Sequence, residues 1–226
     1  MPPLTQSALA EMIDHTLLKA DATRNEIQNL CDEALQHGFA SVCVQPFRVA
    51  QAHLLLKGTK TKVCTVIGFP LGANRSEVKA LEAVRTFTDG ADEVDMVMNI
   101  GSLKDKNFAT VENDIHSVVK AAQGRLVKVI LETCLLTPEE ITEACKIAET
   151  AGASFVKTST GFGKEGATLQ VLRLMHQAVG GRLGIKASGG IRDRKTALVM
   201  IEAGATRLGT SHGVAILNGD DGGVGY

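Results

Sequence analysis

The chain has 226 residues, of which 44% are hydrophobic, and no shift in composition divides it, so we expect one domain over residues 1–226 with a full core. Its 24 basic and 25 acidic residues are mixed along the chain and leave a net charge of -1. This balance excludes the strong field that would attract nucleic acid or an anionic membrane, and it favours a small-molecule partner.

Short runs rich in β-branched residues alternate with amphipathic stretches along the chain. We expect strands at 13–16, 41–44, 63–67, 93–98, 126–131, 155–157, 183–186 and 206–209. Helices are expected before residue 13 and at about 24–38, 47–57, 75–89, 108–122, 138–152, 166–178 and 193–203. Thr23 with Glu26 has the pattern of a capping box, and Thr137 followed by Pro138 marks another helix start.

Successive strand starts lie about 22 to 33 residues apart, the length of a strand, a helix and two loops. Eight such units predict a single (β/α)8 TIM barrel with an extra N-terminal helix and a flexible C-terminal tail over about 218–226. A doubly wound open sheet is the alternative. The segment 44–48 after an early strand is no Gly-rich dinucleotide loop, which argues against that sheet.

The five cysteines form no CxxC pair, and an odd, scattered set indicates reduced thiols. No basic segment followed by an apolar stretch opens the chain, and no run of 18 apolar residues occurs. We therefore expect a soluble, cytoplasmic protein. Neither the cysteines nor the six histidines show metal-ligand spacing, so we expect no metal and no cofactor.

Two lysines end predicted strands, and each is followed by small hydroxylated residues and glycine: Lys157 and Lys186. They lie one strand-helix-strand step apart, and Lys128 lies on the preceding strand, so a barrel would point all three into one space. Burial and a neighbouring cation both disfavour an ammonium ion, which could free one amine as a nucleophile. A strand-end lysine that only pairs with a carboxylate is the commoner case for any single lysine. Three on successive strands favour chemistry.

Other polar residues sit where the same barrel would gather them. Asp95 interrupts an apolar run, so it must be paired, either structurally or as a proton shuttle beside a reacting amine. The glycine turns after Lys157 and Lys186, with Gly209 after the last strand, predict backbone N–H groups that bind a phosphate. Tyr226, the only tyrosine, ends a Gly-rich tail that is either a frayed terminus or an arm reaching the barrel mouth.

Six segments, in order, closely resemble the deoxyribose-phosphate aldolase family: Ile13–Thr16, Ser41–Pro46, Val66–Gly72, Glu93–Gly101, Phe155–Phe162 and Ile185–Arg192. The resemblance implies a metal-independent class I aldolase. Such an enzyme reversibly cleaves 2-deoxy-D-ribose 5-phosphate to D-glyceraldehyde 3-phosphate and acetaldehyde, in deoxyribose phosphate catabolism. No metal or other cofactor is then needed, and the partners are a phosphorylated sugar and aldehydes.

The resemblance also implies roles for individual residues. Lys157 corresponds to the Schiff-base lysine, Lys186 to the second lysine that favours its neutral amine, and Asp95 to the proton-relay acid. Tyr226 corresponds to a terminal tyrosine that assists proton transfer at the acetaldehyde-derived methyl carbon. The implied substrate-binding positions are Asp14, Thr16, Cys43, Lys128, Thr160, Gly161, Gly189, Gly190, Gly209 and Ser211.

Two departures and two alternatives qualify this reading. His212 stands where many members have a second serine, and Phe162 stands where some have a lysine, which would loosen selectivity for phosphorylated substrates. The alternatives are another class I Schiff-base aldolase, acting on ketose phosphates or keto-acids, and a non-catalytic sugar-phosphate-binding barrel. Apolar outer helices predict a homo-oligomer, either a dimer or a tetramer.

Overall fold

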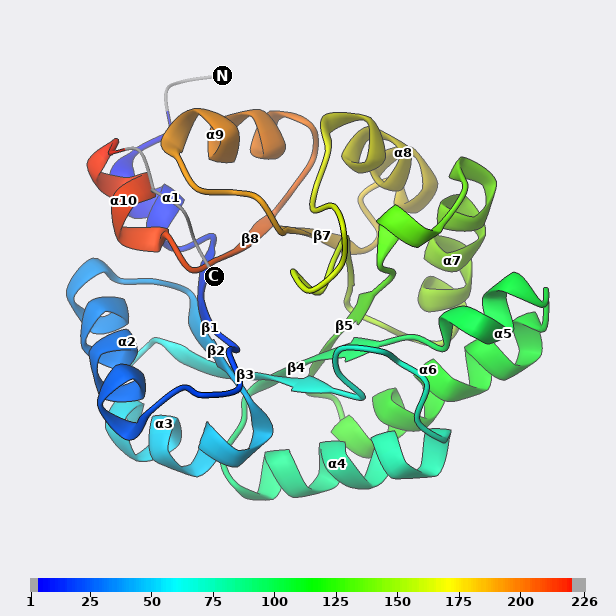
Figure 1. The fold of residues 1–226 in the computed structure, drawn as a ribbon, viewed down its shortest axis with the longest axis horizontal. Helices are drawn as coiled ribbons and strands as arrows, with labels where there is room; N and C mark the ends of the chain where they lie inside the picture. The colour runs from blue at the N-terminus through cyan, green and yellow to red at the C-terminus, as the bar shows by residue number, and fades with distance from the viewer. Residues whose placement is uncertain (1–3, 221–226) are drawn as a thin grey trace.

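Eight parallel strands close into a barrel in the computed structural model, which describes residues 4–220 (Figure 1). Strand order follows the chain, and β8 pairs with β1 to close the ring. The strands are β1 (Ile13–Leu17), β2 (Ser41–Val44), β3 (Lys62–Ile67), β4 (Glu93–Val97), β5 (Leu126–Ile130), β6 (Phe155–Lys157), β7 (Gly184–Ser188) and β8 (Arg207–Thr210). The predicted (β/α)8 TIM barrel is confirmed, and the open doubly wound sheet is wrong.

Helices surround the barrel (Figure 1). They are α1 (Gln6–Ala10), α2 (Arg24–His37), α3 (Val49–Leu56), α4 (Ser76–Thr88), α5 (Ile100–Lys104), α6 (Phe108–Ala122), α7 (Pro138–Thr150), α8 (Leu169–Val179), α9 (Arg194–Glu202) and α10 (Gly213–Asn218), with 3-10 turns η1 (Pro46–Arg48) and η2 (Thr133–Leu135). The predicted N-terminal helix is confirmed as α1. The sequence patterns do not predict α5, α10 or η2, which are too short for a helical period to be recognised. No helix within residues 4–220 is long and apolar enough to cross a membrane.

Residues 218–220, which the predicted flexible tail includes, form the end of a helix in the structure. Asn218 is the last residue of α10, and Gly219 caps the helix with a φ of 81°. The N–H of Asp220 then donates to the Ala215 carbonyl at 3.0 Å, which closes the helix end. Residues 221–226, including Tyr226, lie outside the described residues.

Strand register places the polar residues side by side. Asp95 on β4 is opposite Lys128 on β5, and Lys157 on β6 is opposite Lys186 on β7. Because side chains alternate between the two faces of a strand, partners in register point to the same side of the sheet. The register therefore gathers the three lysines and the carboxylate inside the barrel.

Apolar packing is divided into a large and a small cluster. The large one joins strands and helices, with Ile27 and Ile115 among its fully buried members. The small one consists, among the described residues, of Leu18, Cys43, Cys64 and Val66, with Phe69 packed against it. Most of the hydrophobic stabilisation therefore belongs to the large cluster, and charged residues fill much of the remaining barrel interior.

Candidate active site

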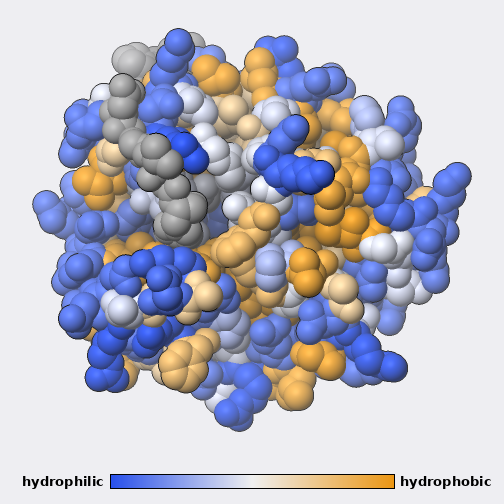
Figure 2. Space-filling view, viewed as in Figure 1, coloured by the Kyte–Doolittle hydropathy of each residue, from blue (hydrophilic) through white to orange (hydrophobic). Residues whose placement is uncertain are grey.

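A pocket opens at the C-terminal ends of the strands, where a barrel of this kind carries its site. Its walls come from β1, β6, β7 and β8 and from the loops that follow them. On the face of the molecule drawn in Figure 2, hydrophobic and hydrophilic side chains are intermixed. The lining residues are Thr16, Leu18, Lys157, Thr160, Gly161, Phe162, Ser188, Gly189, Gly190, Ile191, Arg192, Gly209, Thr210, Ser211 and His212.

Asp95 is the centre of a buried ion cluster beneath this pocket. Its Oδ1 lies 2.9 Å from the Nζ of Lys128. Its Oδ2 lies 2.8 Å from the Nζ of Lys157 and 2.7 Å from that of Lys186. The carboxylate itself is 0% exposed. One oxygen is thus shared by two ammonium groups from adjacent strands.

A second set of contacts surrounds the lysines. Asp14 Oδ2 lies 2.5 Å from Lys186 Nζ as an ion pair, and Arg207 donates to Asp14 Oδ1 at 2.6 Å. Glu93 pairs with Lys128 at 2.6 Å and with Arg207 at 3.6 Å. Four basic side chains therefore meet three carboxylates, which leaves one positive charge in excess when all are ionised.

These contacts decide which groups stay ionised. Burial by itself would raise the pKa of Asp95, but the ammonium groups of Lys128, Lys157 and Lys186 hold it well below its usual range. Burial likewise opposes charge on Lys186, yet Asp14 and Asp95 raise its pKa above the ordinary value. Lys128 shows the same balance, with Asp95 as its strongest partner. Near neutral pH, Asp95 is a carboxylate and Lys128 and Lys186 are ammonium ions.

Access distinguishes the three lysines. Lys157 lines the pocket, whereas Lys128 and Lys186 are fully buried and do not. Lys157 also contacts only one carboxylate oxygen among the described residues, and it shares that oxygen with Lys186. A ligand in the pocket can therefore touch Lys157 while the other two lysines act from behind it.

The far wall of the pocket is built from backbone. Gly161, Gly189 and Gly190 have φ values of 88°, 83° and 78°, which glycine adopts without strain. Within residues 4–220 no hydrogen-bond acceptor is found for the N–H groups of Gly161, Gly190, Ile191 and Ser211. N–H groups without an acceptor among the described residues line one pocket together with Arg192, and this combination suits an anion.

The structure separates the predicted substrate-binding residues into two groups. The pocket is lined by Thr16, Thr160, Gly161, Gly189, Gly190, Gly209 and Ser211. Asp14, Cys43 and Lys128 are instead 0% exposed and are not among the lining residues. Their partners belong to the ion cluster or to the small apolar cluster, so they are placed to support Lys157 and Lys186 from below.

Several pocket residues do not follow from the sequence reasoning: Leu18, Ser188, Ile191, Arg192 and Thr210. Ser188 is the most informative of them, because its buried hydroxyl has no hydrogen-bond partner among the described residues. A Cβ at Gly209 would lie 2.5 Å from that hydroxyl and 2.9 Å from Lys186 Cε, so glycine is required there. The signal was present in the sequence, since Ser188 follows Lys186 by two residues and must share its face.

His212 and Phe162, the two departures from the family pattern, both line the pocket. The Nδ1 of His212 lies 3.1 Å from the Ser211 hydroxyl, and partial burial followed by the charge of Arg192 lowers the His212 pKa. Phe162 meets the Phe69 ring edge-on, with ring centroids 5.3 Å apart. An imidazole and an aromatic rim therefore take the places of a hydroxyl and an ammonium group.

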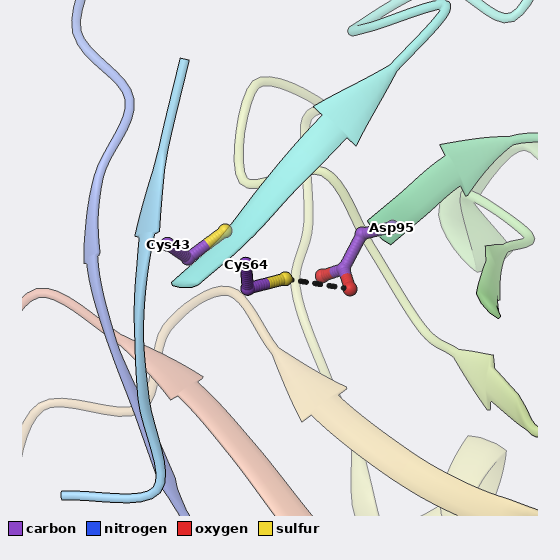
Figure 3. A group of neighbouring side chains, drawn as sticks. All are labelled: Cys43, Cys64 and Asp95. Carbon is purple, nitrogen blue, oxygen red and sulfur yellow. Dashed lines mark hydrogen bonds between the residues drawn. The ribbon is translucent and has the colours of Figure 1, made fainter. Parts of the chain in front are cut away.

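Two groups of acidic and thiol side chains in the barrel are compact enough to be considered as metal ligands. Figure 3 shows Cys43, Cys64 and Asp95, and the second group is Asp14, Cys64 and Glu93. The Cys64 thiol donates to Asp95 Oδ1 at 3.2 Å, and burial raises its pKa well above the usual value, so it remains protonated. In the second group the Lys128 ammonium already lies 2.6 Å from Glu93 and 3.5 Å from Cys64 Sγ. A further cation would be repelled by the lysines, and both groups are better described as parts of the ion cluster.

Comparison with known proteins agrees with this arrangement. Residues 8–219 match the family model described as DeoC/LacD family aldolase. The chain belongs to this aldolase family. It is therefore a lyase, and the pocket above Lys157 is the candidate active site of a DeoC/LacD family aldolase.

Relatives and solved structures of the family cover nearly the whole chain. The chain is 60% identical over 215 residues to the deoxyribose-phosphate aldolase of Geobacillus sp. strain WCH70, covering 95% of this chain and 96% of the relative. It is 54% identical to that of Histophilus somni strain 2336, over 93% of this chain and 94% of the relative. A putative deoxyribose-phosphate aldolase structure from Coccidioides immitis superposes with a TM-score of 0.94 at 43% identity, over 96% and 87% of the two chains. The tetrameric enzyme from Aeropyrum pernix gives 0.89 at 35% identity, over 95% and 91%.

Proposed function

We propose that this protein is a class I deoxyribose-phosphate aldolase that works through a Schiff base on Lys157. It would cleave 2-deoxy-D-ribose 5-phosphate reversibly to D-glyceraldehyde 3-phosphate and acetaldehyde. The observation that carries the proposal is the position of Lys157: it belongs to the ion cluster around Asp95 and also lines the pocket that holds the unpaired backbone N–H groups. An amine and an anion site share one cavity.

The proposed chemistry begins at the Lys157 amine. The neutral amine attacks the aldehyde carbon of the open-chain sugar, and loss of water gives an iminium ion. The C3 hydroxyl then loses its proton and the bond between C2 and C3 breaks. The electrons of that bond move into the iminium to give an enamine, and glyceraldehyde 3-phosphate leaves. The enamine that remains takes up a proton at carbon, and hydrolysis releases acetaldehyde and the amine.

The residues around Lys157 have separate tasks in this scheme. Asp95 is ionised, so it can accept a proton through a bound water and hand it back in the reverse direction. Lys186 supplies the adjacent positive charge, and its contact with Asp14 keeps it in place. The Ser188 hydroxyl has no hydrogen-bond partner within residues 4–220 and is available to a substrate hydroxyl. The phosphate would lie against Gly161, Gly190, Ile191 and Ser211.

Trapping the imine tests the proposal directly. The protein is incubated with acetaldehyde and reduced with borohydride, and digestion followed by mass spectrometry locates the modification. We expect one N-ethyl group on Lys157 in the wild type and none in Lys157→Leu. The exposed Lys146→Met on α7 is the matched control and should be labelled at Lys157 as the wild type is. An unmodified Lys157 in the wild type would contradict the proposal, and replacing acetaldehyde by pyruvate or dihydroxyacetone phosphate separates the other class I donors.

We also propose a homo-oligomer that works in the cytoplasm. Five free thiols support a reducing compartment.

Three large apolar side chains on or near α3 and α4 are well exposed, namely Leu54 at 73%, Leu71 at 74% and Leu81 at 62%, and such residues support an association of subunits. The tetramer formed by the Aeropyrum pernix aldolase supports the same inference. Sedimentation equilibrium would give the number of subunits.

A further inference from the structure

Glu132 is a buried carboxylate beside the pocket that the chemistry above does not use. It follows β5, is 4% exposed, and has a φ of 53°, a left-handed conformation that is uncommon for a residue with a side chain. No lysine, arginine or histidine within residues 4–220 pairs with it. A buried carboxylate without a cation is costly unless hydrogen bonds hold it.

Within residues 4–220, the hydrogen bonds to this carboxylate come from the Cys134 thiol, at 3.9 Å, and from the loop after β6. The N–H of Thr160 points at both carboxylate oxygens, at 3.3 and 3.4 Å. The Thr160 hydroxyl donates a very short hydrogen bond to Oε2 of the same carboxylate. That hydroxyl in turn accepts from the N–H of Phe162 at 3.0 Å. Glu132 is therefore the end of a chain of bonds that runs through Thr160 to Phe162.

This chain of bonds determines which backbone group is left for a ligand. It occupies the N–H of Thr160 and the N–H of Phe162, on either side of Gly161. The N–H of Gly161, between them, has no acceptor within the described chain, and Gly161 lines the pocket. A Cβ on Gly163 would lie 3.2 Å from the Glu132 carboxyl carbon, so the loop also packs closely against this side chain. The orientation of the Gly161 peptide follows from Glu132.

The charge of Glu132 makes a direct ligand contact unfavourable. A carboxylate would repel a phosphate at short range, because few water molecules screen the two charges in a partly buried site. Glu132 does not line the pocket, and Thr160 stands between the two. The position of Glu132 is therefore explained by its hydrogen bonds to Thr160 and not by direct contact with a ligand.

We propose that Glu132 is a positioning residue for the phosphate end of the substrate: through Thr160 it holds the loop 160–163 so that the Gly161 N–H faces the phosphate. The inference rests on the proposed function, because it assigns the pocket wall at Gly161 to a phosphate. It assigns no part in carbon chemistry to Glu132.

Glu132→Gln tests the role with little change in volume. The amide keeps one acceptor but turns an NH2 group toward one of the two Thr160 donors, so the loop loses its fixed orientation. We expect KM for 2-deoxyribose 5-phosphate to rise about tenfold, the effect of one well-placed hydrogen bond, with kcat changed less than about threefold. The kcat/KM for unphosphorylated 2-deoxyribose should change less than about twofold. Glu143→Gln, the same change at a half-exposed position on α7, is the control.

Three results would decide against the inference or against the function beneath it. An unchanged KM for the phosphorylated sugar, or equal losses with both sugars, would overturn the positioning role. If Glu132→Gln does not fold, Thr160→Val removes the hydroxyl link from the other side and should give the same split. In the double variant the two effects should not add. A wild-type protein that traps no imine on Lys157 would instead overturn the proposed function, so the two failures are distinguishable.

Discussion

Asp95 accepts hydrogen bonds from lysines on three neighbouring strands, and this sharing distinguishes Lys157 from the other two. The cluster holds four basic side chains and three carboxylates, so one positive charge lacks a counter-charge. Lys128 and Lys186 each contact two or more carboxylates. Lys157 contacts one oxygen that Lys186 also contacts. Among the described residues of the cluster, Lys157 is thus the lysine with the fewest carboxylate contacts, and it is the one that reaches the pocket.

Lys186→Met is the substitution that tests this account. With Lys186 gone, Lys157 has Asp95 Oδ2 to itself, and the neighbouring positive charge that opposes its own is lost, so its ammonium form is held more firmly. We expect the yield of borohydride-trapped imine at pH 7 to fall about tenfold or more and the midpoint of its pH profile to move upward. Trapping with acetaldehyde across a pH series measures both. A midpoint that does not move would show that Lys186 has no electrostatic effect on Lys157.

At this scale, the sequence predicts which residues meet where a polar residue interrupts an apolar run. Lys157, Lys186 and Asp95 stand out in the sequence for that reason, and the structure brings them into contact. The depth of each residue along the barrel axis is not predicted, because it depends on the stagger between strands, which the sequence does not show. Asp14 and Cys43 therefore lie below the pocket they are predicted to line, while Ser188, at the end of β7, lines it without having been predicted as a site residue.

Local capping signals determine where several helices begin. Thr23 accepts from the Glu26 N–H at 3.3 Å while the Glu26 carboxylate accepts from the Thr23 N–H at 2.8 Å, which completes the predicted capping box of α2. Thr137 and Glu140 repeat it at α7. Helices of 13 to 15 residues such as α4 and α6 follow from hydrophobic period alone, but α5 and α10, with 5 and 6 residues, do not. Helices this short are marginal in isolation, so packing against the barrel must stabilise them.

Thr23→Ala measures what such a cap contributes. It removes the side-chain acceptor for the Glu26 N–H and the hydroxyl donor to Glu26, so we expect the free energy of unfolding to fall by about 1 kcal/mol. Urea denaturation at neutral pH, with an unchanged slope, is the measurement. Thr142→Ala is the matched control, because that hydroxyl donates back to the Pro138 carbonyl within α7, and alanine favours the helix. Equal losses in the two variants would mean that the cap has no special role.

At the scale of the whole molecule, eight repeated units and a closed ring follow from the strand spacing, since eight is the number that closes a barrel filled by side chains. What the spacing does not reveal is how the interior is filled. The strands read as apolar, yet their inward positions include Asp14, Asp95, Lys128 and Lys186, all fully buried. The stability of the ring therefore depends on ionisation as well as on packing.

That dependence predicts a plateau of stability with pH. Asp14 and Asp95 have lowered pKa values in the folded protein, so their contribution is complete above the ordinary value of 3.8 and is lost as pH falls below it. Lys128 and Lys186 have raised pKa values, so their contribution is complete below the ordinary value of 10.5 and is lost as pH rises beyond it. Denaturation at successive pH values should show a flat region between, with an acid slope of up to about 2.7 kcal/mol per pH unit from two carboxyls. If stability falls equally steeply at acid pH in Asp14→Asn, groups other than Asp14 are responsible for that slope.

The oxygen shared by Lys157 and Lys186 has one more consequence for a reaction through an imine. An iminium at Lys157 carries the same single positive charge as the ammonium that it replaces, on the same nitrogen, 2.8 Å from Asp95. In the proposed scheme, the iminium would therefore have the same charge as the ammonium form of Lys157. Creating a new charge in a buried site would require the surrounding groups to reorganise. Because the iminium adds no new charge, the neighbouring ions can keep their positions.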